Sequence, residues 1–434
     1  MLSKHEAFGA GLGFKVAAGR INRRLGKLTA ETLIVIGGGQ AAASLIAKRR
    51  NLGGSEKIVL ISDEAFPPYQ RPPLSKKYLM GETDLARLFL RPETWYGKNG
   101  IELHLGQRVA VIDRARHTVC LRSGDTLTYD RLALTTGATP RRLSGRIGGN
   151  LDGVFTMRAL ADADAMRPFI ECGGSVLVVG GGYIGLEAAS VAARMGLRVT
   201  VIETAERILQ RVAAEATSNY FRELHANNGV TIREQIGLAY LIERDGHVVG
   251  AKLSNGEQLK CDFVIVGIGV EPNDRLARES GLDVGDGILV NSRCCTSDPA
   301  ILAAGDCARF PYGNATIRLE SVQNAIDQAE AAAHVLSGDN APYAPHPWFW
   351  SDQFDVKLQI VGLNMGHDST VVRPGKRPGA QSVWYYRGDD LLAVDAMNDG
   401  VAYMIAGRLL KAGRSPAKDQ IANPSSDLKN FLVQ

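Results

Sequence analysis

Two glycine-rich segments have the residue types and the spacing of turns that bind phosphate. Each begins with a run of apolar residues and continues into Gly-x-Gly-x-x-Gly or Gly-x-Gly-x-x-Ala. The key positions are Gly37, Gly39 and Ala42 in the first segment, and Gly180, Gly182 and Gly185 in the second. In such a turn the first glycine permits a tight bend, the second lets backbone amides approach a pyrophosphate, and the third position packs a helix on its strand. Two turns of this kind predict two bound dinucleotides.

An acidic residue follows the next apolar run after each turn. The run IVLISDE reaches Asp63, with Glu64 beside it, and the run VTVIE ends at Glu203. A carboxylate in this position accepts hydrogen bonds from the hydroxyl groups of a ribose. We therefore expect Asp63 and Glu203 to bind the two riboses, with Glu64 as the alternative in the first segment.

The alternation of strand and helix patterns predicts how these residues are positioned. A basic N-terminal extension is expected over 1–30, a first nucleotide module over 31–150 that resumes over 271–345, a second module over 151–270, and a C-terminal domain over 346–434. The stretch 141–153, rich in Gly and Arg, has the composition of a linker. The sequence thus predicts an α/β protein in which one module is inserted into the other.

Some elements are predicted in more detail. Apolar residues at helical spacing predict a helix over 183–195. A strand over 301–306 and an alanine-rich helix over 322–336 are expected to complete the first module. Alternating apolar residues on both sides of Gly388 and Asp389 predict antiparallel strands that turn there, followed by a helical tail.

Composition and charge limit the classes of function. The chain has 434 residues, is 45% hydrophobic and carries a formal net charge of +4. Residues 1–30 contain six cations and one acid, so the remainder carries a net charge of only −1. A nearly neutral body argues against nucleic-acid binding, and no apolar run approaches the roughly 20 residues that cross a bilayer. The basic, acid-poor leading segment resembles a transit peptide, but a bacterial extension or an early start codon fits it equally.

The six cysteines do not form a redox or zinc motif. They are Cys120, Cys172, Cys261, Cys294, Cys295 and Cys307, and none lies at a CxxC spacing or at a CxxxxC spacing after the first glycine turn. The adjacent Cys294 and Cys295 are interpreted as small hydrophobic residues. The eight histidines likewise show no metal-ligand spacing, so no metal site is expected. Reduced structural thiols indicate a cytoplasmic protein.

Several longer motifs together resemble one enzyme family. In chain order they are GGGQAA, PYQRPPLSK, FLRPE, TTGATPR, VGGGYIGLE, VGIGVEPN, AAGDCA and WFWSDQFDVKLQIVG. Over about residues 31–430 the chain is similar to FAD-dependent ferredoxin reductases of bacterial oxygenase systems, the putidaredoxin reductase type within the pyridine nucleotide-disulfide oxidoreductases. WFWSDQ is the most specific motif, because related flavin reductases share the glycine turns and AAGD.

The resemblance implies a fold, an activity and partners. The fold would be two Rossmann-like domains of glutathione-reductase type plus a small α+β C-terminal domain, with the first module binding FAD and the second binding NAD. The enzyme would move a hydride from NADH to FAD and then single electrons to a 2Fe-2S ferredoxin, which feeds a monooxygenase or dioxygenase. It would be a monomer or weak dimer without a membrane or nucleic-acid partner.

The resemblance also assigns cofactor contacts to residues of this chain. Those expected at FAD are Gly37, Gly39, Ala42, Asp63, Arg71, Lys76, Asp306 and Val322, and those expected at NAD are Gly180, Gly182, Gly185, Glu203 and Gly269. Asp306 would bind the ribityl chain, with a helix N-cap as the alternative. Glu203 favours NADH, because an acid repels the extra phosphate of NADPH. Arg198 and Arg207 lie close to it in sequence and weaken that preference.

Three residues are the expected catalytic set. By resemblance Lys76 lies near the flavin and pairs with Glu187, whose role would be to orient the nicotinamide, whereas a solvated helix residue is the structural alternative for Glu187. Trp350 resembles a tryptophan at the flavin edge where ferredoxin docks. The alternative is that Trp348, Phe349 and Trp350 only fill a domain interface.

The residues that would contact ferredoxin do not carry over from the family. Glu330 occupies a helix position where a basic residue would help an acidic partner, and the possible substitutes are Arg87, Arg91, Arg309, Arg318 and Lys357. Two other functions therefore stay open. One is a monodehydroascorbate or quinone reductase on the same scaffold, and the other is an NADH-sensing flavoprotein that acts as a binding module.

Overall fold

A five-stranded parallel sheet forms the centre of the first module. The computed structural model describes residues 31–339 and 341–432, so the basic extension predicted over 1–30 lies outside the described residues. The sheet has the order β19-β7-β1-β2-β3, with β1 (Thr32–Ile36), β2 (Lys57–Ile61), β3 (Ile101–His104), β7 (Arg131–Leu134) and β19 (Ile301–Ala303). Leu33 and Val35 face a core shared with two long helices, and Ile34 and Ile36 face the opposite core. This alternation follows the two-residue period of a strand.

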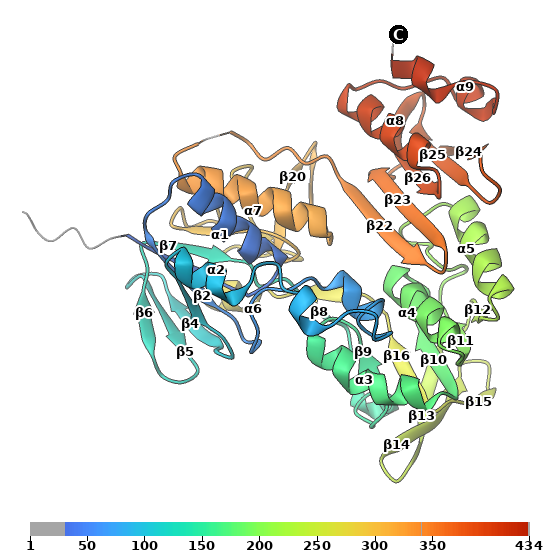
Figure 1. The fold of residues 1–434 in the computed structure, drawn as a ribbon, viewed down its shortest axis with the longest axis horizontal. Coiled ribbons are helices and arrows are strands. Elements are labelled where there is room, and N and C mark those ends of the chain that lie inside the picture. The colour runs from blue at the N-terminus through green and yellow to red at the C-terminus, as the bar shows by residue number, and fades with distance from the viewer. Residues whose placement is uncertain (1–30, 340, 433–434) are drawn as a thin grey trace, which may run out of the picture. The chain divides into compact units, whose positions relative to one another are not determined.

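Those two helices are α1 (Gln40–Asn51) and α7 (Val322–Leu336), which lie side by side on the sheet (Figure 1). The expected closing elements are therefore confirmed as parts of the first module, since β19 pairs with β7 and α7 packs on α1. The module is completed by β4 (Val109–Asp113), β5 (Thr118–Leu121), β6 (Thr126–Thr128), β18 (Ile288–Leu289), β20 (Ala308–Tyr312) and β21 (Ala315–Ile317), with α2 (Glu93–Lys98), α6 (Arg275–Glu279) and the short helices η1 (Pro72–Ser75) and η2 (Leu85–Arg87).

The second module repeats the same architecture. Its parallel sheet has the order β12-β11-β10-β16-β9, with β9 (Val154–Thr156), β10 (Ser175–Val179), β11 (Arg198–Ile202), β12 (Thr231–Arg233) and β16 (Phe263–Val266). Its helices are α3 (Leu160–Cys172), α4 (Tyr183–Arg194) and α5 (Glu215–Asn227), and an antiparallel sheet adds β13 (Leu238–Arg244), β14 (His247–Leu253) and β15 (Gln258–Lys260). The helix predicted over 183–195 is α4, whose last turn ends with Met195 as C-cap.

The chain crosses between the modules at a two-stranded antiparallel ladder. This ladder pairs β8 (Ala138–Pro140) with β17 (Val270–Pro272). The stretch 141–153 is not a free linker, because Leu143 and Leu151 pack against the core of the second module and η3 (Gly145–Ile147) forms a turn within it. Its composition is that of a linker, but its two leucines pack against the second module.

The C-terminal domain is an antiparallel sheet covered by helices. The strand order is β22-β23-β26-β25-β24, with β22 (Trp348–Gln353), β23 (Val356–Gly362), β24 (Ser369–Pro374), β25 (Gln381–Arg387) and β26 (Asp390–Met397). The expected turn is present at Gly388, whose φ of +54° suits glycine, and the helical tail consists of α8 (Gly400–Lys411), α9 (Lys418–Ala422) and η4 (Leu428–Leu432). Buried Arg373 donates to the carbonyl oxygens of Ile421 and Asn423 and so fixes the tail.

Polar contacts join the C-terminal domain to helix α5 of the second module and to the segment before it. Thr217 donates to the buried carboxylate of Asp395 at 2.7 Å, and the hydroxyl of Tyr385 donates to the same oxygen. The Tyr385 oxygen also accepts from the amide of Ala214 at 2.9 Å. Burial raises the pKa of Asp395 to about 6. Across the described part of the chain, no helix is long and apolar enough to cross a membrane.

Candidate functional site

The two glycine-rich turns have nearly the same geometry. Gly37 has φ +106° and Gly180 has φ +107°, a region that side chains rarely adopt. A Cβ atom on Gly37 would lie 2.4 Å from the carbonyl oxygen of Thr135, and one on Gly180 would lie 2.4 Å from that of Gly267. Both bends therefore require glycine for the reason that the spacing predicts, namely a tight passage past a neighbouring strand.

The amino ends of α1 and α4 are open toward the space beyond each turn. Gly39 and Gly182 are the N-cap residues, neither helix has a side-chain cap, and a Cβ atom at either glycine would meet nothing within 4 Å. The first amides of each helix thus lack a capping side chain and carry the positive end of the helix dipole. This arrangement fits the pyrophosphate of a dinucleotide at both turns.

The third positions of the two turns differ in how closely helix and strand approach. A Cβ atom on Gly185 would lie 2.1 Å from the carbonyl oxygen of Gly180, so only glycine fits there. The corresponding Ala42 is fully buried in the core between α1 and its sheet. The first turn therefore has room for one methyl group that the second does not have.

Glu203 lies beside the second turn. Its carboxylate accepts from the amide of Gly181 at 2.7 Å and from that of Ala205 at 2.9 Å. Arg198 is at the other end of β11, and Arg207 donates to the hydroxyl of Ser218 at 2.5 Å. The two arginines that weakened the NADH prediction are thus placed away from Glu203 or bound to another group.

The acid of the first turn is placed differently. Ile61 pairs with Ile36 just before the first turn, as Ile202 pairs with Val179 before the second. The residue that matches Glu203 in this register is therefore Ser62, and the exposed Asp63 comes one position later. Asp63 stays the predicted ribose ligand. Its alternative, Glu64, is instead engaged by Arg71 at 2.5 Å.

A hydrogen bond and an ion pair link Arg71 to Asp306 through Arg158. Arg71 donates to the carbonyl oxygen of Arg158 at 3.0 Å, and the guanidinium of Arg158 contacts the Asp306 carboxylate at 2.8 Å. Strand β20 begins two residues after Asp306, so this aspartate is not a helix N-cap. Sequence reasoning missed Arg158, whose only signal was a cation just before α3. Arg158 is thus paired with a predicted FAD ligand, whose role stays a prediction.

The remaining predicted contacts lie near the two turns. Val322 is the first residue of α7. A Cβ atom on Gly305 would lie 3.7 Å from Ala325 of the same helix and 3.1 Å from Ala41 of α1. Gly269 has φ +96° and follows the end of β16, two residues after the Gly267 that touches the second turn. The assignment of Val322 to FAD and of Gly269 to NAD stays a prediction.

Lys76 lies where three parts of the chain meet. Its ammonium nitrogen is 3.1 Å from Glu187 on α4 and 3.3 Å from Asp352 on β22. Glu187 also accepts from the hydroxyl of Ser351 at 2.8 Å. Glu187 is only 7% exposed, which excludes the solvated helix residue considered above. Burial raises the pKa of Glu187, whereas the Lys76 charge and the Ser351 hydroxyl oppose that rise.

Trp350 shares one face of β22 with Asp352 and Trp348. Trp350 is half-buried, and its ring centroid is 5.5 Å from that of Trp348. Phe349 is on the opposite face, and its ring centroid is 5.0 Å from that of Tyr183. Because side chains alternate along a strand, Trp350 and Asp352 share one face, and Phe349 lies on the other face against Tyr183 of α4. The position of Trp350 at the flavin edge stays a prediction.

The cysteines are free thiols that do not form a redox pair in the structure. Burial raises the pKa of Cys261 and of Cys294 to about 12, and burial also raises that of Cys307. A thiol with such a pKa is protonated at neutral pH and is a poor nucleophile.

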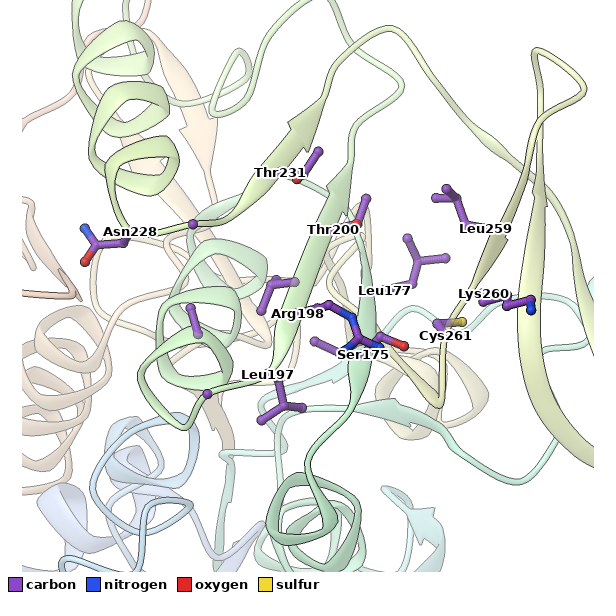
Figure 2. A pocket seen from close by; sticks show the side chains of 15 residues that line it. Ser175, Leu177, Leu197, Arg198, Thr200, Asn228, Thr231, Leu259, Lys260 and Cys261 are labelled. Carbon is purple, nitrogen blue, oxygen red and sulfur yellow. The ribbon is translucent and has the colours of Figure 1, made fainter.

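One hollow among the described residues lies away from the glycine turns. It has a volume of about 520 Å³ and lies at the amino ends of β10, β11 and β12, lined by residues that include Ser175, Arg198 and Thr231 (Figure 2). The glycine turns and Glu203 lie at the carboxyl ends of the same strands. Ligands of open parallel sheets bind at the carboxyl ends, so this hollow is not assigned to a cofactor.

The possible docking cations differ in availability. Arg318 is almost fully covered and pairs with Glu320, and Arg309 contacts Asp286. Arg87, Arg91 and Lys357 are exposed. Glu330 pairs with Lys48 at 3.0 Å. Only the exposed three of the five substitutes therefore remain candidates for contact with a partner.

Comparisons with known proteins agree with this geometry. Residues 31–329 match the family of pyridine nucleotide-disulphide oxidoreductases, and residues 348–432 match the reductase C-terminal family. A ferredoxin reductase subunit of 5,5'-dehydrodivanillate O-demethylase from Sphingobium sp. is 40% identical over 405 residues, which are 92% of this chain and 98% of that protein. The ferredoxin–NAD(+) reductase component of an anthranilate 1,2-dioxygenase system from Burkholderia cepacia is 39% identical over 418 residues, 93% of this chain and all of that protein.

A solved structure has the same fold over nearly the whole chain. In the covalent putidaredoxin reductase–putidaredoxin complex, the matching chain superimposes with a TM-score of 0.89 at 36% identity and covers 93% of this chain and 98% of its own. The glycine turns, with uncapped helix ends and an acid after the second, fit the FAD and NAD(H) of this family. The chain therefore belongs to the FAD-dependent pyridine nucleotide-disulphide oxidoreductases that carry a reductase C-terminal domain.

Proposed function

We propose that this protein is an NADH:ferredoxin reductase that supplies electrons to an oxygenase. The observation that carries the proposal is the junction of Lys76 with buried Glu187 and partly exposed Asp352, which joins both nucleotide modules to the C-terminal domain. The relatives support it, because their names describe ferredoxin reductases of a demethylase and a dioxygenase system and a complex with putidaredoxin.

The chain's own residues would divide the work between binding and orientation. When bound, FAD supplies the chemistry that accepts a hydride as an electron pair and releases electrons one at a time. The amino ends of α1 and α4 bind the two pyrophosphates, and Arg158 with Asp306 binds the polar chain of FAD. Glu203 accepts from the ribose hydroxyls of NADH and repels the phosphate of NADPH.

Lys76 and Glu187 hold the region where the nicotinamide must be oriented. A buried ion pair with further hydrogen bonds has few alternative arrangements, so it fixes the shape and the charge of this region. Orientation of reacting groups contributes much of the rate of such transfers. Trp350, on the same strand face as Asp352, is proposed to line the exit toward ferredoxin.

The partner is proposed to be a ferredoxin of the 2Fe-2S type, and the protein is proposed to act as a monomer or weak dimer in the cytoplasm. Electron-transfer encounters are small and rely on charge steering. Arg87, Arg91 and Lys357 are the exposed cations proposed to contribute to that steering.

A split between two electron acceptors tests the proposal. Trp350→Ala should impair NADH-driven reduction of a host 2Fe-2S ferredoxin more than reduction of ferricyanide, and Tyr240→Ala, an exposed aromatic residue on β13, is the control. Ferredoxin reduction by the unchanged protein should saturate at micromolar concentration and weaken as salt rises. If no host ferredoxin is reduced while monodehydroascorbate or a quinone is reduced efficiently, the protein is a reductase of that other kind.

A further inference from the structure

Two polar side chains of β22 are buried beside Glu187. Ser351 and Gln353 are both fully inaccessible, as is His225 on α5. Ser351 and Gln353 lie on the strand face opposite Trp350. A buried polar group requires hydrogen bonds to offset its lost hydration, so the partners of these three residues show what they do.

The three residues form a directed chain of hydrogen bonds that ends on Glu187. His225 Nε2 lies 2.8 Å from Gln353 Oε1, Gln353 Nε2 donates to Ser351 Oγ at 3.2 Å, and Ser351 Oγ is 2.8 Å from Glu187 Oε1. A carboxylate only accepts, so the single hydroxyl proton of Ser351 must point at Glu187. The Ser351 oxygen must then accept from the amide of Gln353. This in turn requires His225 to donate to Gln353 Oε1.

The protonation state of His225 agrees with this direction. Burial lowers the pKa of His225 to about 4, so the ring is neutral at physiological pH. Its Nδ1 atom has no hydrogen-bond partner among the described residues, which fits a ring that carries its proton on Nε2. Hydrogen bonds aligned in one direction polarise and strengthen one another.

The groups that contact Glu187 decide whether its carboxyl group is ionised. The carboxylate faces Lys76 at 3.1 Å, Ser351 at 2.8 Å and Ser75 at 3.4 Å, and the acidic Asp352 contacts the same Lys76 at 3.3 Å. Burial and Asp352 favour the neutral acid, whereas Lys76 and Ser351 favour the carboxylate. Removal of the Ser351 hydroxyl would therefore move Glu187 toward protonation and weaken its hold on Lys76.

We propose that Ser351, held by Gln353 and His225, is a positioning residue that keeps Glu187 ionised and Lys76 in place, so that the C-terminal domain completes the hydride-accepting site. This inference rests on the proposed function for the identity of that site. It assigns to β22 a role in the NADH half of the reaction, in addition to the proposed docking of ferredoxin.

The test compares two serines that contact Glu187 differently. Ser351→Ala removes the hydroxyl that donates to the carboxylate. Ser190→Ala is the matched control, because Ser190 is also buried but donates to the backbone carbonyl of Glu187 at 2.8 Å. Both variants are prepared as FAD-loaded full-length protein. Gln353→Met, similar in volume but without the amide, is the second variant.

The first measurement follows the protonation of Glu187 without substrate. An infrared pH titration records the C=O band of protonated buried carboxyls, and its loss in Glu187→Gln assigns the band. In Ser351→Ala the band should appear at a pH about one unit or more above that of the unchanged protein, since a hydrogen bond to a charged group is lost. Gln353→Met should shift it in the same direction by less, and Ser190→Ala should leave it in place.

The second measurement is the rate at which NADH bleaches the bound flavin, recorded across pH. In Ser351→Ala the bleaching rate should begin to fall at a pH about one unit or more above that of the unchanged protein. When Glu187→Gln is already present, adding Ser351→Ala should not change the bleaching rate or its pH dependence. Equal behaviour of Ser351→Ala and Ser190→Ala in both measurements would overturn the inference. Neither measurement uses ferredoxin, so both can be interpreted even if the protein does not reduce the proposed partner.

Discussion

Residue types alone do not predict the contact between Lys76 and Glu187. They are separated by 111 positions and lie in different modules, so only a family resemblance predicts that they meet. The structure places them 3.1 Å apart, and their catalytic role stays a prediction. The inward position of Ser351 and Gln353 is not predicted from the motif WFWSDQ, in which the aromatic residues are the prominent feature. The signal for it is the alternation of side chains along a strand, which places these two polar residues on the same face as Phe349.

Replacing Lys76 tests that role at the residue scale. Lys76→Met should still bind FAD, but NADH should bleach the flavin about 10-fold or more slowly, because the nicotinamide is no longer held in a reactive orientation. Stopped-flow absorbance measures this rate. Lys57→Met is the control, since Lys57 forms an exposed ion pair with Glu102 on the first sheet. An unchanged rate in Lys76→Met would return the pair to a purely structural role.

Glu203 determines the expected choice of nicotinamide. The unchanged protein should use NADH with a kcat/KM at least about 10-fold above that for NADPH, or roughly 1.4 kcal/mol. Glu203→Ser should narrow this ratio, because it removes the charge that repels the phosphate of NADPH. Glu257→Ser, an acid of the same module that pairs with Arg233, should leave the ratio unchanged. Equal use of the two nucleotides by the unchanged protein would contradict the assignment.

Asp395 should make stability depend on pH. Its pKa is about 6 in the folded chain against 3.8 for a free side chain, so the native state holds the proton more tightly. Stability from this group is therefore greatest below about pH 4 and falls as pH rises through 6, by about 2 to 3 kcal/mol at most.

The measurement is the Tm of the unchanged protein minus that of Asp395→Asn. This difference should decrease between about pH 4 and pH 6 and stay flat above. Asp390→Asn, an exposed aspartate on the same strand, is the control. A difference that does not change with pH would show that Asp395 titrates normally.

At the scale of elements, the sequence predicts those with a strong period or a required turn. The helix over 183–195, the α7 helix and the hairpin at Gly388 are present because apolar spacing and turn chemistry act locally. The packing of the stretch 141–153 could not be predicted, since Leu143 and Leu151 pack against a core that strands from separate parts of the second module build together. The offset between Ser62 and Asp63 likewise depends on strand register, which is a tertiary property.

The turn before α4 makes a prediction at the same scale. Gly185→Ala would place a methyl group 2.1 Å from the carbonyl oxygen of Gly180, so the helix must move away from the turn. The KM for NADH should rise about 10-fold or more with FAD retained, because the amides at the amino end of α4 leave their phosphate. Gly97→Ala in α2 meets no atom within 4 Å and is the steady-state control. A normal KM in Gly185→Ala would place the nucleotide elsewhere.

For the whole molecule, the main structural feature is that three parts of the chain meet around Lys76. Lys76 comes from the first module, Glu187 from the second, and Ser351 and Asp352 from the C-terminal domain. Such a junction has no local sequence signal, because each residue is unremarkable beside its chain neighbours. The junction ties the C-terminal domain to both nucleotide modules, and its role in hydride uptake stays a prediction.

The most direct test of the central claim is a count of electrons under anaerobic conditions. The FAD-loaded protein is mixed with a limiting amount of NADH and an excess of a host 2Fe-2S ferredoxin, and the absorbance of the reduced ferredoxin is recorded. Because a hydride carries two electrons and each ferredoxin accepts one, the account predicts two reduced ferredoxins for each NADH consumed. Complete oxidation of NADH with no ferredoxin reduced, while a quinone or monodehydroascorbate takes up the electrons, would contradict it.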